Sequence, residues 1–499
     1  MNETVDSSMR KVLLIQAPWE KQTKSIFRYL HGVFPPLGLA TIASFLEKVG
    51  HEVSIIDCTA EFIKPENIIE HIDKSYDFVG ISATTATAPG GYKIAELIKE
   101  KMNGAVVIFG GVHATAMPEE VISQPAIDIC VRGEGEETIK EIVAGVPLKE
   151  IKGITFKENG SAIHNADRAM IRDLDAYPLP AYHLLPMKKY RSITGAAIKE
   201  PSIGLVVSRG CPAKCEYCYT AVLGKKMRMK SPNRILEEIS LLKNKYGIKE
   251  IDFYDDTFTV NKKVIGEVCN LLIQNKVNIA WSCLTRMDYV NEDLLKLMKR
   301  AGCHQVMYGV EAGRQEVRDA IGKKLSVDIK NIFKMTQKIG IQIRATYMIG
   351  NYVETREDVL ETIKKSIEYD SEYAIFNVTT PFPGTELYKR LDKENRILHK
   401  DWAKYDFYNV VFSHPNLSAE EIETFYQQAN KQFYFRPIMF FKHFKNLFSS
   451  LNMIKMYSRA AIGMTRAIWG WYFNNSVSVD LIKKIYTQKI GKYLKQKRT

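Results

Sequence analysis

Three of the eight cysteines of this 499-residue chain are crowded into one short stretch, SRGCPAKCEYCYT at positions 208–220. Cys211, Cys215 and Cys218 have the spacing C-x3-C-x2-C and follow an apolar run directly. Cysteine thiolates bind zinc and iron–sulfur clusters, so the pattern predicts a metal site.

Two kinds of metal site compete for this loop. A structural zinc site usually takes four ligands in two close pairs, and no CxxC or HxxxH follows, so His113, His183 or Cys283 would have to complete it in space. A four-iron cluster held by three cysteines would instead keep one iron free for a substrate or cofactor. The missing fourth cysteine favours the cluster.

The loop resembles that of the radical S-adenosylmethionine superfamily, and Tyr217 and Tyr219 flank its last cysteine as aromatic residues do there. The resemblance implies that Cys211, Cys215 and Cys218 hold a [4Fe-4S] cluster. It also implies that the open iron chelates S-adenosylmethionine, whose reductive cleavage yields a 5′-deoxyadenosyl radical. An electron donor such as flavodoxin or ferredoxin is then expected.

The resemblance extends to motifs downstream and implies five contacts to S-adenosylmethionine. They are Asp255, Asp256, Arg286, Glu311 and Gly350. Taken singly, the aspartates could be a helix N-cap pair and the glutamate part of an ordinary turn. The last segment reads GNYVETRED where related proteins read Gly-x-Pro-Gly-Glu-Thr, which puts its contacts to adenine in doubt. No catalytic residue is assigned.

Alternating strands and helices must position these residues. From position 204 the strands are predicted at 204–208, 250–254, 278–283, 305–309, 342–349 and 373–379, with helices such as 231–245 and 291–300 between them. Six such units predict a partial (β/α)6 barrel over residues 201–400, with functional residues where strands end.

Residues 10–140 predict a separate doubly wound α/β domain of Rossmann type. Its strands are expected at 11–16, 52–57, 78–82, 106–109 and 127–131, with helices including 39–49 and 92–101. The proline-bearing stretch 174–190 makes residues 141–200 a predicted linker between the domains.

This first domain resembles the cobalamin-binding domains of one radical S-adenosylmethionine branch. The resemblance implies cobalamin contacts from Asp57, Ser82, Thr84, Gly110 and Gly111. Thr59 stands where such domains often have the histidine that binds cobalt, so a lower ligand from that motif is not expected. The alternative is a Rossmann-like scaffold that has lost its cofactor.

Segments 35–39, 110–115 and 132–136 also resemble this branch. The implied activity is cobalamin-dependent methyl transfer to an unactivated carbon of a hydrophobic or lipid-like small molecule. A radical cyclase or oxidoreductase without net methyl transfer is the enzymatic alternative. A zinc-stabilised binding protein whose basic tail docks to membranes is the alternative from another class.

The positive charge of the chain is concentrated at one end. Of the formal net charge of +13, residues 433–499 carry +12, from 13 Lys and Arg against one acid, Asp480. This helical, aromatic-rich region, counted from 401 to 499, fits contact with an anionic membrane surface, or an ordinary helical cap with solvated lysines. No nucleic-acid module is recognisable. The scattered other cysteines and the polar start predict a cytoplasmic protein, peripheral to the membrane in the first case.

Overall fold

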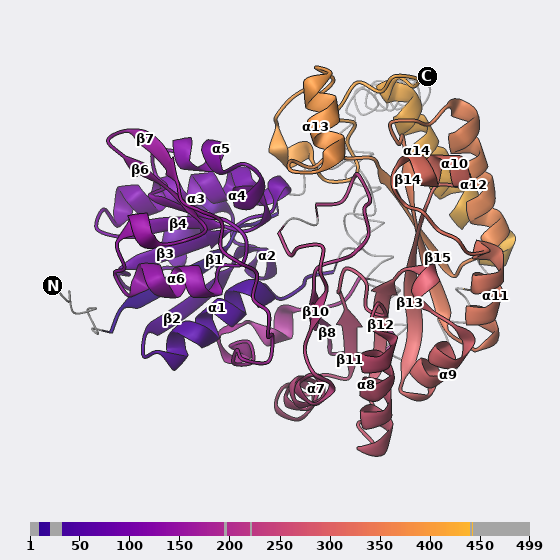
Figure 1. Cartoon of the computed structure of the whole chain (residues 1–499), viewed down its shortest axis with the longest axis horizontal. Coiled ribbons are helices and arrows are strands. Elements are labelled where there is room, and N and C mark those ends of the chain that lie inside the picture. The colour runs from indigo at the N-terminus through magenta and orange to yellow at the C-terminus, as the bar shows by residue number, and fades with distance from the viewer. Residues whose placement is uncertain (1–8, 20–31, 194–196, 220–221, 440–441, 443–499) are drawn as a thin grey trace, which may run out of the picture.

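Two α/β bodies lie side by side in the computed structural model, joined by an extended stretch of chain (Figure 1). The structure describes residues 9–19, 32–193, 197–219, 222–439 and 442. Each body is built on one largely or wholly parallel sheet. The predicted doubly wound domain followed by a partial barrel is confirmed.

The first sheet has the strand order β2-β1-β3-β4-β5-β6-β7. Its strands β1 to β5 run parallel and are buried on both faces, as the runs of Val and Ile require. The strands are β1 (Lys11–Gln16), β2 (Glu52–Asp57), β3 (Phe78–Ser82), β4 (Val106–Gly110), β5 (Ile129–Val131), β6 (Ile154–Glu158) and β7 (Ser161–His164). The helices are α1 (Leu37–Lys48), α2 (Cys58–Glu61), α3 (Ala88–Lys101), α4 (Val112–Ala116), α5 (Pro118–Ser123) and α6 (Glu136–Val143).

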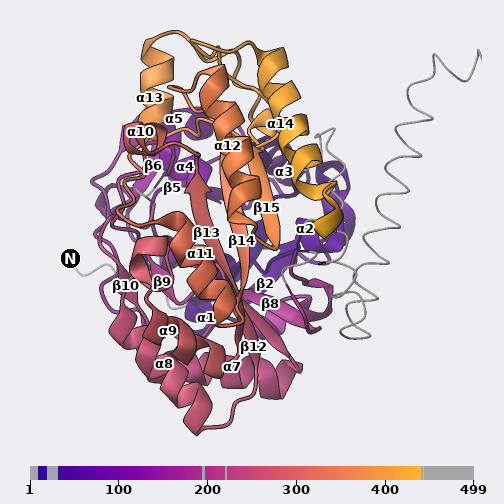
Figure 2. The ribbon, with the colours of Figure 1, turned by 90° about the vertical axis from the view of Figure 1, so that its right-hand side faces the viewer.

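The second sheet is an open barrel of parallel strands in the order β15-β14-β13-β12-β11-β8 (Figure 2). Its strands are β8 (Ser202–Leu205), β11 (Glu250–Phe253), β12 (Ala280–Thr285), β13 (Cys303–Glu311), β14 (Gln342–Ile349) and β15 (Tyr373–Val378). Its helices are α7 (Pro232–Tyr246), α8 (Lys262–Gln274), α9 (Glu292–Arg300), α10 (Gln315–Ala320), α11 (Ile329–Lys338) and α12 (Arg356–Tyr369). Polar N-caps start α7, α8, α9, α11 and α12.

The predicted linker is wrong in its first part. Residues 154–164 form the antiparallel hairpin of β6 and β7, which extends the first sheet beyond β5. Asn159 and Gly160 both have positive φ values, 50° and 80°, as a two-residue hairpin turn demands. The later part, 174–190, contains only short 3-10 turns, in agreement with its prolines.

A short antiparallel pair, β9 (Ser208–Arg209) with β10 (Arg228–Met229), stands apart from both sheets. The chain then continues from the barrel into α13 (Glu386–Lys393) and α14 (Ala419–Tyr434). Phe433 and Met439 complete the barrel core. Residues 443–499, which make up most of the basic region, lie outside the described residues, and so do the amphipathic helices expected there.

Among the described residues, no helix combines the length and the hydropathy of a bilayer-spanning segment.

Candidate functional site

The cysteine loop starts from a crowded backbone turn. Gly210 has a φ of +92°, and a Cβ placed there would lie 2.7 Å from the carbonyl oxygens of Gly224 and Lys226. The next residue, Cys211, is buried, donates its backbone N–H to Gly224 at 3.1 Å and has its thiol 3.5 Å from the hydroxyl of Thr257. Only glycine fits at position 210, so the sequence fixes this turn directly before the first cysteine.

Contacts from the barrel hold the rest of the loop. The backbone N–H of Glu216 donates to Ile321 at 3.0 Å, and the N–H of Leu387 donates back to Glu216 at 3.0 Å. Desolvation, together with the charges of Asp256, Cys215 and Cys211, raises the pKa of Cys218 to about 12. A cation bound beside these sulfurs would favour the thiolate of Cys218.

Within the described residues, no three His, Cys, Asp or Glu side chains converge as ligands of a single metal ion. A four-iron cluster is a larger body, and its three thiolates each bind a different iron.

Charged residues at the ends of the barrel strands surround the loop. Desolvation raises the pKa of Cys215, and the charges of Lys323 and Arg286 act in the opposite direction while Glu311 adds to the rise. Lys323 donates to Glu311 at 3.0 Å, and both side chains are buried. Glu311 has a φ of +67° at the bulged end of β13, a strained backbone that is typical of functional sites.

Arg286 also lies beside the loop, but its guanidinium is already engaged. It donates to both carboxylate oxygens of Asp288, at 3.0 and 2.7 Å, and to the carbonyl of Lys324 at 2.7 Å. The predicted contact of Arg286 to S-adenosylmethionine stays a prediction.

The two aspartates after β11 have different surroundings. Asp255 is buried, and its Oδ1 accepts from the backbone N–H groups of Val207 and Ser208 and from the Ser208 hydroxyl, at 3.0, 2.5 and 2.5 Å. Burial raises the pKa of Asp255 to about 6 against these hydrogen bonds. Asp255 therefore braces the chain between β8 and β9, and Asp256, which is exposed, is the carboxylate that faces Cys218.

Gly350 is also predicted to contact S-adenosylmethionine, but its described contacts do not connect it to the cysteine loop. Its N–H and that of Asn351 donate to Glu354 Oε2 at 2.9 and 2.8 Å. A Cβ at Gly350 would press on Ile422 of α14 at 3.1 Å. Burial raises the pKa of Glu354 to about 8. The segment thus packs against α14, and its contact to adenine stays a prediction.

Lys323 is the residue that sequence reasoning missed near the cysteines. It follows the positive-φ Gly322, whose Cβ position is blocked by the carbonyl of Lys214 in the cysteine loop. The Gly-Lys pair after a short helix was the available signal, but nothing local in the sequence ties it to residues more than a hundred positions away.

A cavity of about 300 Å³ lies between the first domain and the loop-bearing side of the barrel. On the side of the first domain, the cavity is lined by residues at the ends of β3, β4 and β5 and at the starts of α1 and α6. On the other side, it is lined by residues 206–209, Leu223, Lys230 and Glu238. Neither α1 nor α6 has a side-chain N-cap. The start of α1 has no acidic residue in its first turn and favours an anionic group of a bound molecule, whereas Glu136 and Glu137 stand in the first turn of α6.

The predicted cobalamin contacts divide between those at the cavity and those away from it. Ser82, Gly110 and Gly111 line it. Asp57 instead caps α2 and accepts from the hydroxyl of Tyr190 at 3.0 Å. Thr84 caps a 3-10 turn and is not among the lining residues. The last two predictions gain no support from the geometry.

His113, considered above as a metal ligand, is fully buried and lies 3.0 Å from the hydroxyl of Tyr92. Its ring packs edge-on against Trp402, whose indole N–H donates to Glu120 at 2.7 Å. His113 therefore joins the first domain to the chain beyond the barrel.

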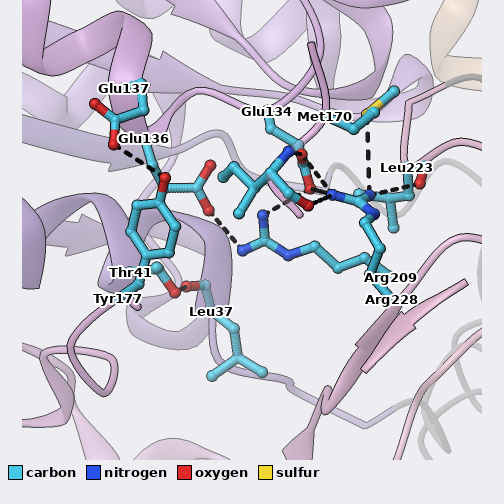
Figure 3. Close-up of polar contacts among 11 residues, drawn as sticks. Leu37, Thr41, Glu134, Glu136, Glu137, Met170, Tyr177, Arg209, Leu223 and Arg228 are labelled. Atoms are coloured by element: carbon cyan, nitrogen blue, oxygen red, sulfur yellow. Dashed lines mark hydrogen bonds and ion pairs between the residues drawn. The ribbon is translucent and has the colours of Figure 1, made fainter. Parts of the chain in front are cut away.

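An ion-pair cluster closes the cavity on the side of the cysteine loop (Figure 3). Glu134, in the loop before α6, and Glu136, the first residue of α6, face Arg209 of β9 and Arg228 of β10. We call these four residues the interdomain clamp. Glu134 accepts from Arg209 at 2.8 Å and from Arg228 at 2.8 and 2.9 Å; Glu136 accepts from Arg209 at 2.5 Å. Although burial alone would raise it, these hydrogen bonds lower the pKa of Glu134.

Comparison with known proteins gives two domain matches. Residues 23–143 match the model of the B12 binding domain, and residues 205–366 match that of the radical SAM superfamily.

The chain is 37% identical over 440 residues to the uncharacterized methyltransferase PH0819 of Pyrococcus horikoshii, covering 87% of this chain and 94% of that protein. It is 26% identical over 488 residues to the anaerobic magnesium-protoporphyrin IX monomethyl ester cyclase of Cereibacter sphaeroides, covering 92% and 78%. Its fold is similar to that of the radical S-adenosylmethionine methyltransferase TsrM from Kitasatospora setae, with cobalamin and a [4Fe-4S] cluster bound. The TM-score is 0.69 at 15% identity, over 93% of this chain and 100% of that chain.

Proposed function

The chain belongs to the family of cobalamin-dependent radical S-adenosylmethionine methyltransferases, and on this premise we propose that it methylates an unactivated carbon of a hydrophobic small molecule. Cys211, Cys215 and Cys218 are proposed to hold a [4Fe-4S] cluster, and the interdomain cavity to hold cobalamin. The activity is proposed from the family together with the arrangement of the two sites.

The observation that best supports this proposal is that the proposed cluster site and the proposed cobalamin cavity share one wall. Residues 206–209 line the cavity on one side and lead within two residues to Cys211. A short-lived radical needs both reagents at contact range, and a shared wall provides that proximity.

The residues at the cavity fit cobalamin in two respects. Gly38, Gly110 and Gly133 line it, and an added Cβ at these positions would meet nothing closer than 3.8 Å, so a large ring can approach the backbone. The uncapped start of α1, which has no acidic residue in its first turn, suits the phosphate of the nucleotide tail.

When bound, the cluster with S-adenosylmethionine supplies a hydrogen-abstracting 5′-deoxyadenosyl radical, and cobalamin supplies the methyl group. The residues of this chain position these reagents. Gly210 and the backbone contacts of Glu216 position the cysteine loop. Asp256, Glu311 and Lys323 offer charged groups for the amino and carboxylate ends of S-adenosylmethionine.

A hydrophobic substrate is proposed from the inner face of the barrel. Leu284, Met307 and Ile375 are half-buried and alternate along their strands with residues that pack under the helices. They present apolar surface to the barrel interior. The lipid-like character of the substrate rests on the basic, aromatic C-terminal region and is part of the proposal.

The test is metal analysis with absorption spectroscopy on the full chain, purified anaerobically and reconstituted with iron, sulfide and hydroxocobalamin. About four irons and about one cobalt per chain are expected. Four irons without cobalt would overturn methyl transfer and leave a cyclase or oxidoreductase of the same fold. Zinc without iron would overturn both.

Contact with an anionic membrane is proposed for residues 433–499 on charge alone. The full chain should sediment with vesicles of anionic lipid and be released by salt, because screening weakens such contacts. Equal binding to neutral vesicles would contradict the proposal. A flavodoxin- or ferredoxin-type electron donor is likewise proposed.

A further inference from the structure

We propose that Glu134 is a positioning residue through which the cobalamin domain closes the base of the cysteine loop, so that occupancy of the cavity and of the cluster site are coupled. The proposal rests on the function proposed above. It concerns the interdomain clamp, to which that function assigns no catalytic step.

The cysteine loop has a weak base of its own. β9 and β10 flank residues 210–227, which include all three cysteines, and they pair over only two residues each. An isolated two-stranded pair is marginal in water even when it is longer. The loop therefore depends on contacts from outside the pair.

The side chains at this base make the weakness greater. Arg209 and Arg228 are directly opposite each other in the register of the pair. Like charges in that position destabilise an antiparallel pair. An anion between the two arginines is needed. Among the described residues, the carboxylates that form ion pairs with them are Glu134 and Glu136, and both come from the first domain.

Glu134 is well placed for this task. Its side chain is 4% exposed, and its Oε1 accepts from both arginines, at 2.8 and 2.9 Å. Its Oε2 accepts from Arg228 and from the backbone N–H of Ile171 at 2.7 Å. Charge-assisted hydrogen bonds of this kind are geometrically demanding, so a small shift of Glu134 is felt at the base of the loop.

The same segment forms the cavity wall. Gly133, Glu134, Gly135 and Glu136 line the cavity together with Arg209. A molecule that fills the cavity fixes the position of this segment and hence of the two carboxylates. Coupling between the two sites then follows, and thermodynamic linkage makes it reciprocal.

The experiment compares hydroxocobalamin binding by the full chain with and without the reconstituted cluster. Absorbance titration gives two dissociation constants for each variant, and their ratio measures the coupling. For the unsubstituted chain the cluster-loaded form should bind at least about fivefold more tightly, the lower end of typical coupling. In Glu134→Gln, which keeps the shape and removes the charge, the ratio should fall to about 1.

Arg390→Gln is the matched control. Arg390 of α13 forms an ion pair with Glu216 inside the cysteine loop, at 2.9 Å, but does not touch the first domain. This variant should keep the ratio of the unsubstituted chain. Arg209→Lys, which keeps the charge but loses the two-pronged contact, should give an intermediate ratio even if Glu134→Gln folds poorly.

The outcomes separate this inference from the function on which it rests. If the unsubstituted chain takes up no cobalamin or no cluster, the proposed function fails. If it takes up both but the ratio is 1, or if Glu134→Gln keeps the full ratio, only the coupling through Glu134 is overturned. The reduced cluster's electron paramagnetic resonance spectrum, recorded with and without hydroxocobalamin, is a second readout and should lose its cobalamin dependence in Glu134→Gln.

Discussion

At the residue scale, buried carboxyl groups should set how stability changes with pH. Glu354 is fully buried beneath α14, and burial raises its pKa from about 4.5 to about 8. A raised pKa in the folded state means that the folded chain holds a proton that the unfolded chain releases. The stabilisation is complete below about pH 4.5 and is lost as the pH rises through 8.

Glu354→Gln should therefore flatten the fall of the melting temperature between pH 5 and 8. Glutamine can still accept from Gly350 and Asn351 through its oxygen and does not titrate. Over this range, the free energy of unfolding of the unsubstituted chain should fall more steeply than that of the variant, by up to about 1.4 kcal/mol per pH unit. Thermal unfolding of both proteins over this range is the measurement, with Glu420→Gln, an exposed carboxyl on α14, as control. Parallel curves would contradict the assignment.

The cysteines of the loop should not be interchangeable with those of the core. Cys215→Ala should abolish the iron–sulfur absorption, because two thiolates cannot hold the cluster that three are proposed to hold. It should still bind hydroxocobalamin, with the affinity of the cluster-free chain. Cys269→Ala, a buried thiol of α8 far from the loop in the sequence, should keep its iron. Iron content and cobalt content per chain test both variants, and full iron retention in Cys215→Ala would refute the ligand assignment.

At the scale of elements, the turn before the first cysteine makes a sharp prediction. Gly210→Ala puts a methyl group among three carbonyl oxygens at 2.7–2.8 Å in a backbone of φ +92°. The left-handed backbone alone costs about 1–2 kcal/mol for a residue other than glycine, and the overlap must displace β9 or the loop. Cluster assembly should be lost or strongly reduced.

Gly247→Ala is the matched control for this change. Gly247 ends α7 with a φ of +69°, and an added Cβ meets nothing within 4 Å. It should lower the melting temperature through the backbone cost alone and leave the iron content unchanged. Equal iron contents in the two variants would show that the packing around Gly210 does not position the cysteine loop.

Elements with a strong local pattern could be predicted from the sequence. β1, β2 and β3 have the predicted bounds because Val, Ile and Leu bounded by polar residues mark buried parallel strands. β14, with the sequence QIRATYMI, also has the predicted bounds. The hairpin of β6 and β7 was missed although Asn159-Gly160 is a hairpin signal, because the prolines further on suggested a linker for the whole stretch. β9 and β10 are too short to leave any periodicity.

The candidate site likewise has parts that could be predicted from the sequence and parts that could not. The cysteine spacing and the glycines of the cavity are local patterns, and sequence reasoning found them. The hydrogen bonds of Asp255 with Val207 and Ser208 join residues 48 and 47 positions apart, and that of Glu134 with Arg209 joins residues 75 positions apart. No local pattern encodes such pairs, so only the folded chain shows that Asp255 braces the loop.

At the scale of the whole molecule, the first domain packs on the barrel through Val33, Ala40 and Ala60, and two polar attachments add to this apolar contact. The interdomain clamp is one. The other is Trp402, which packs on His113 with ring centroids 5.4 Å apart and donates its indole N–H to Glu120. Two attachments resist rotation of the domains about either one, which keeps the shared cavity at a fixed shape.

Removing both attachments should therefore weaken the contact between the domains by more than the two single changes together. Glu134→Gln and Trp402→Phe singly should each lower the melting temperature. The double variant should lose more stability than the sum of the two single changes. Residues that brace one shared interface are not additive, because each single variant still has the other contact.

Trp281→Phe is the control for the loss of an indole. Trp281 donates its N–H to Ala301 at 2.9 Å, a hydrogen bond inside the barrel. Combined with Glu134→Gln, it should lower stability additively, because the attachment through Trp402 is intact. Differential scanning calorimetry of the apo chain measures all five variants. An additive loss in the Glu134→Gln/Trp402→Phe double variant would mean that the two attachments act independently of each other.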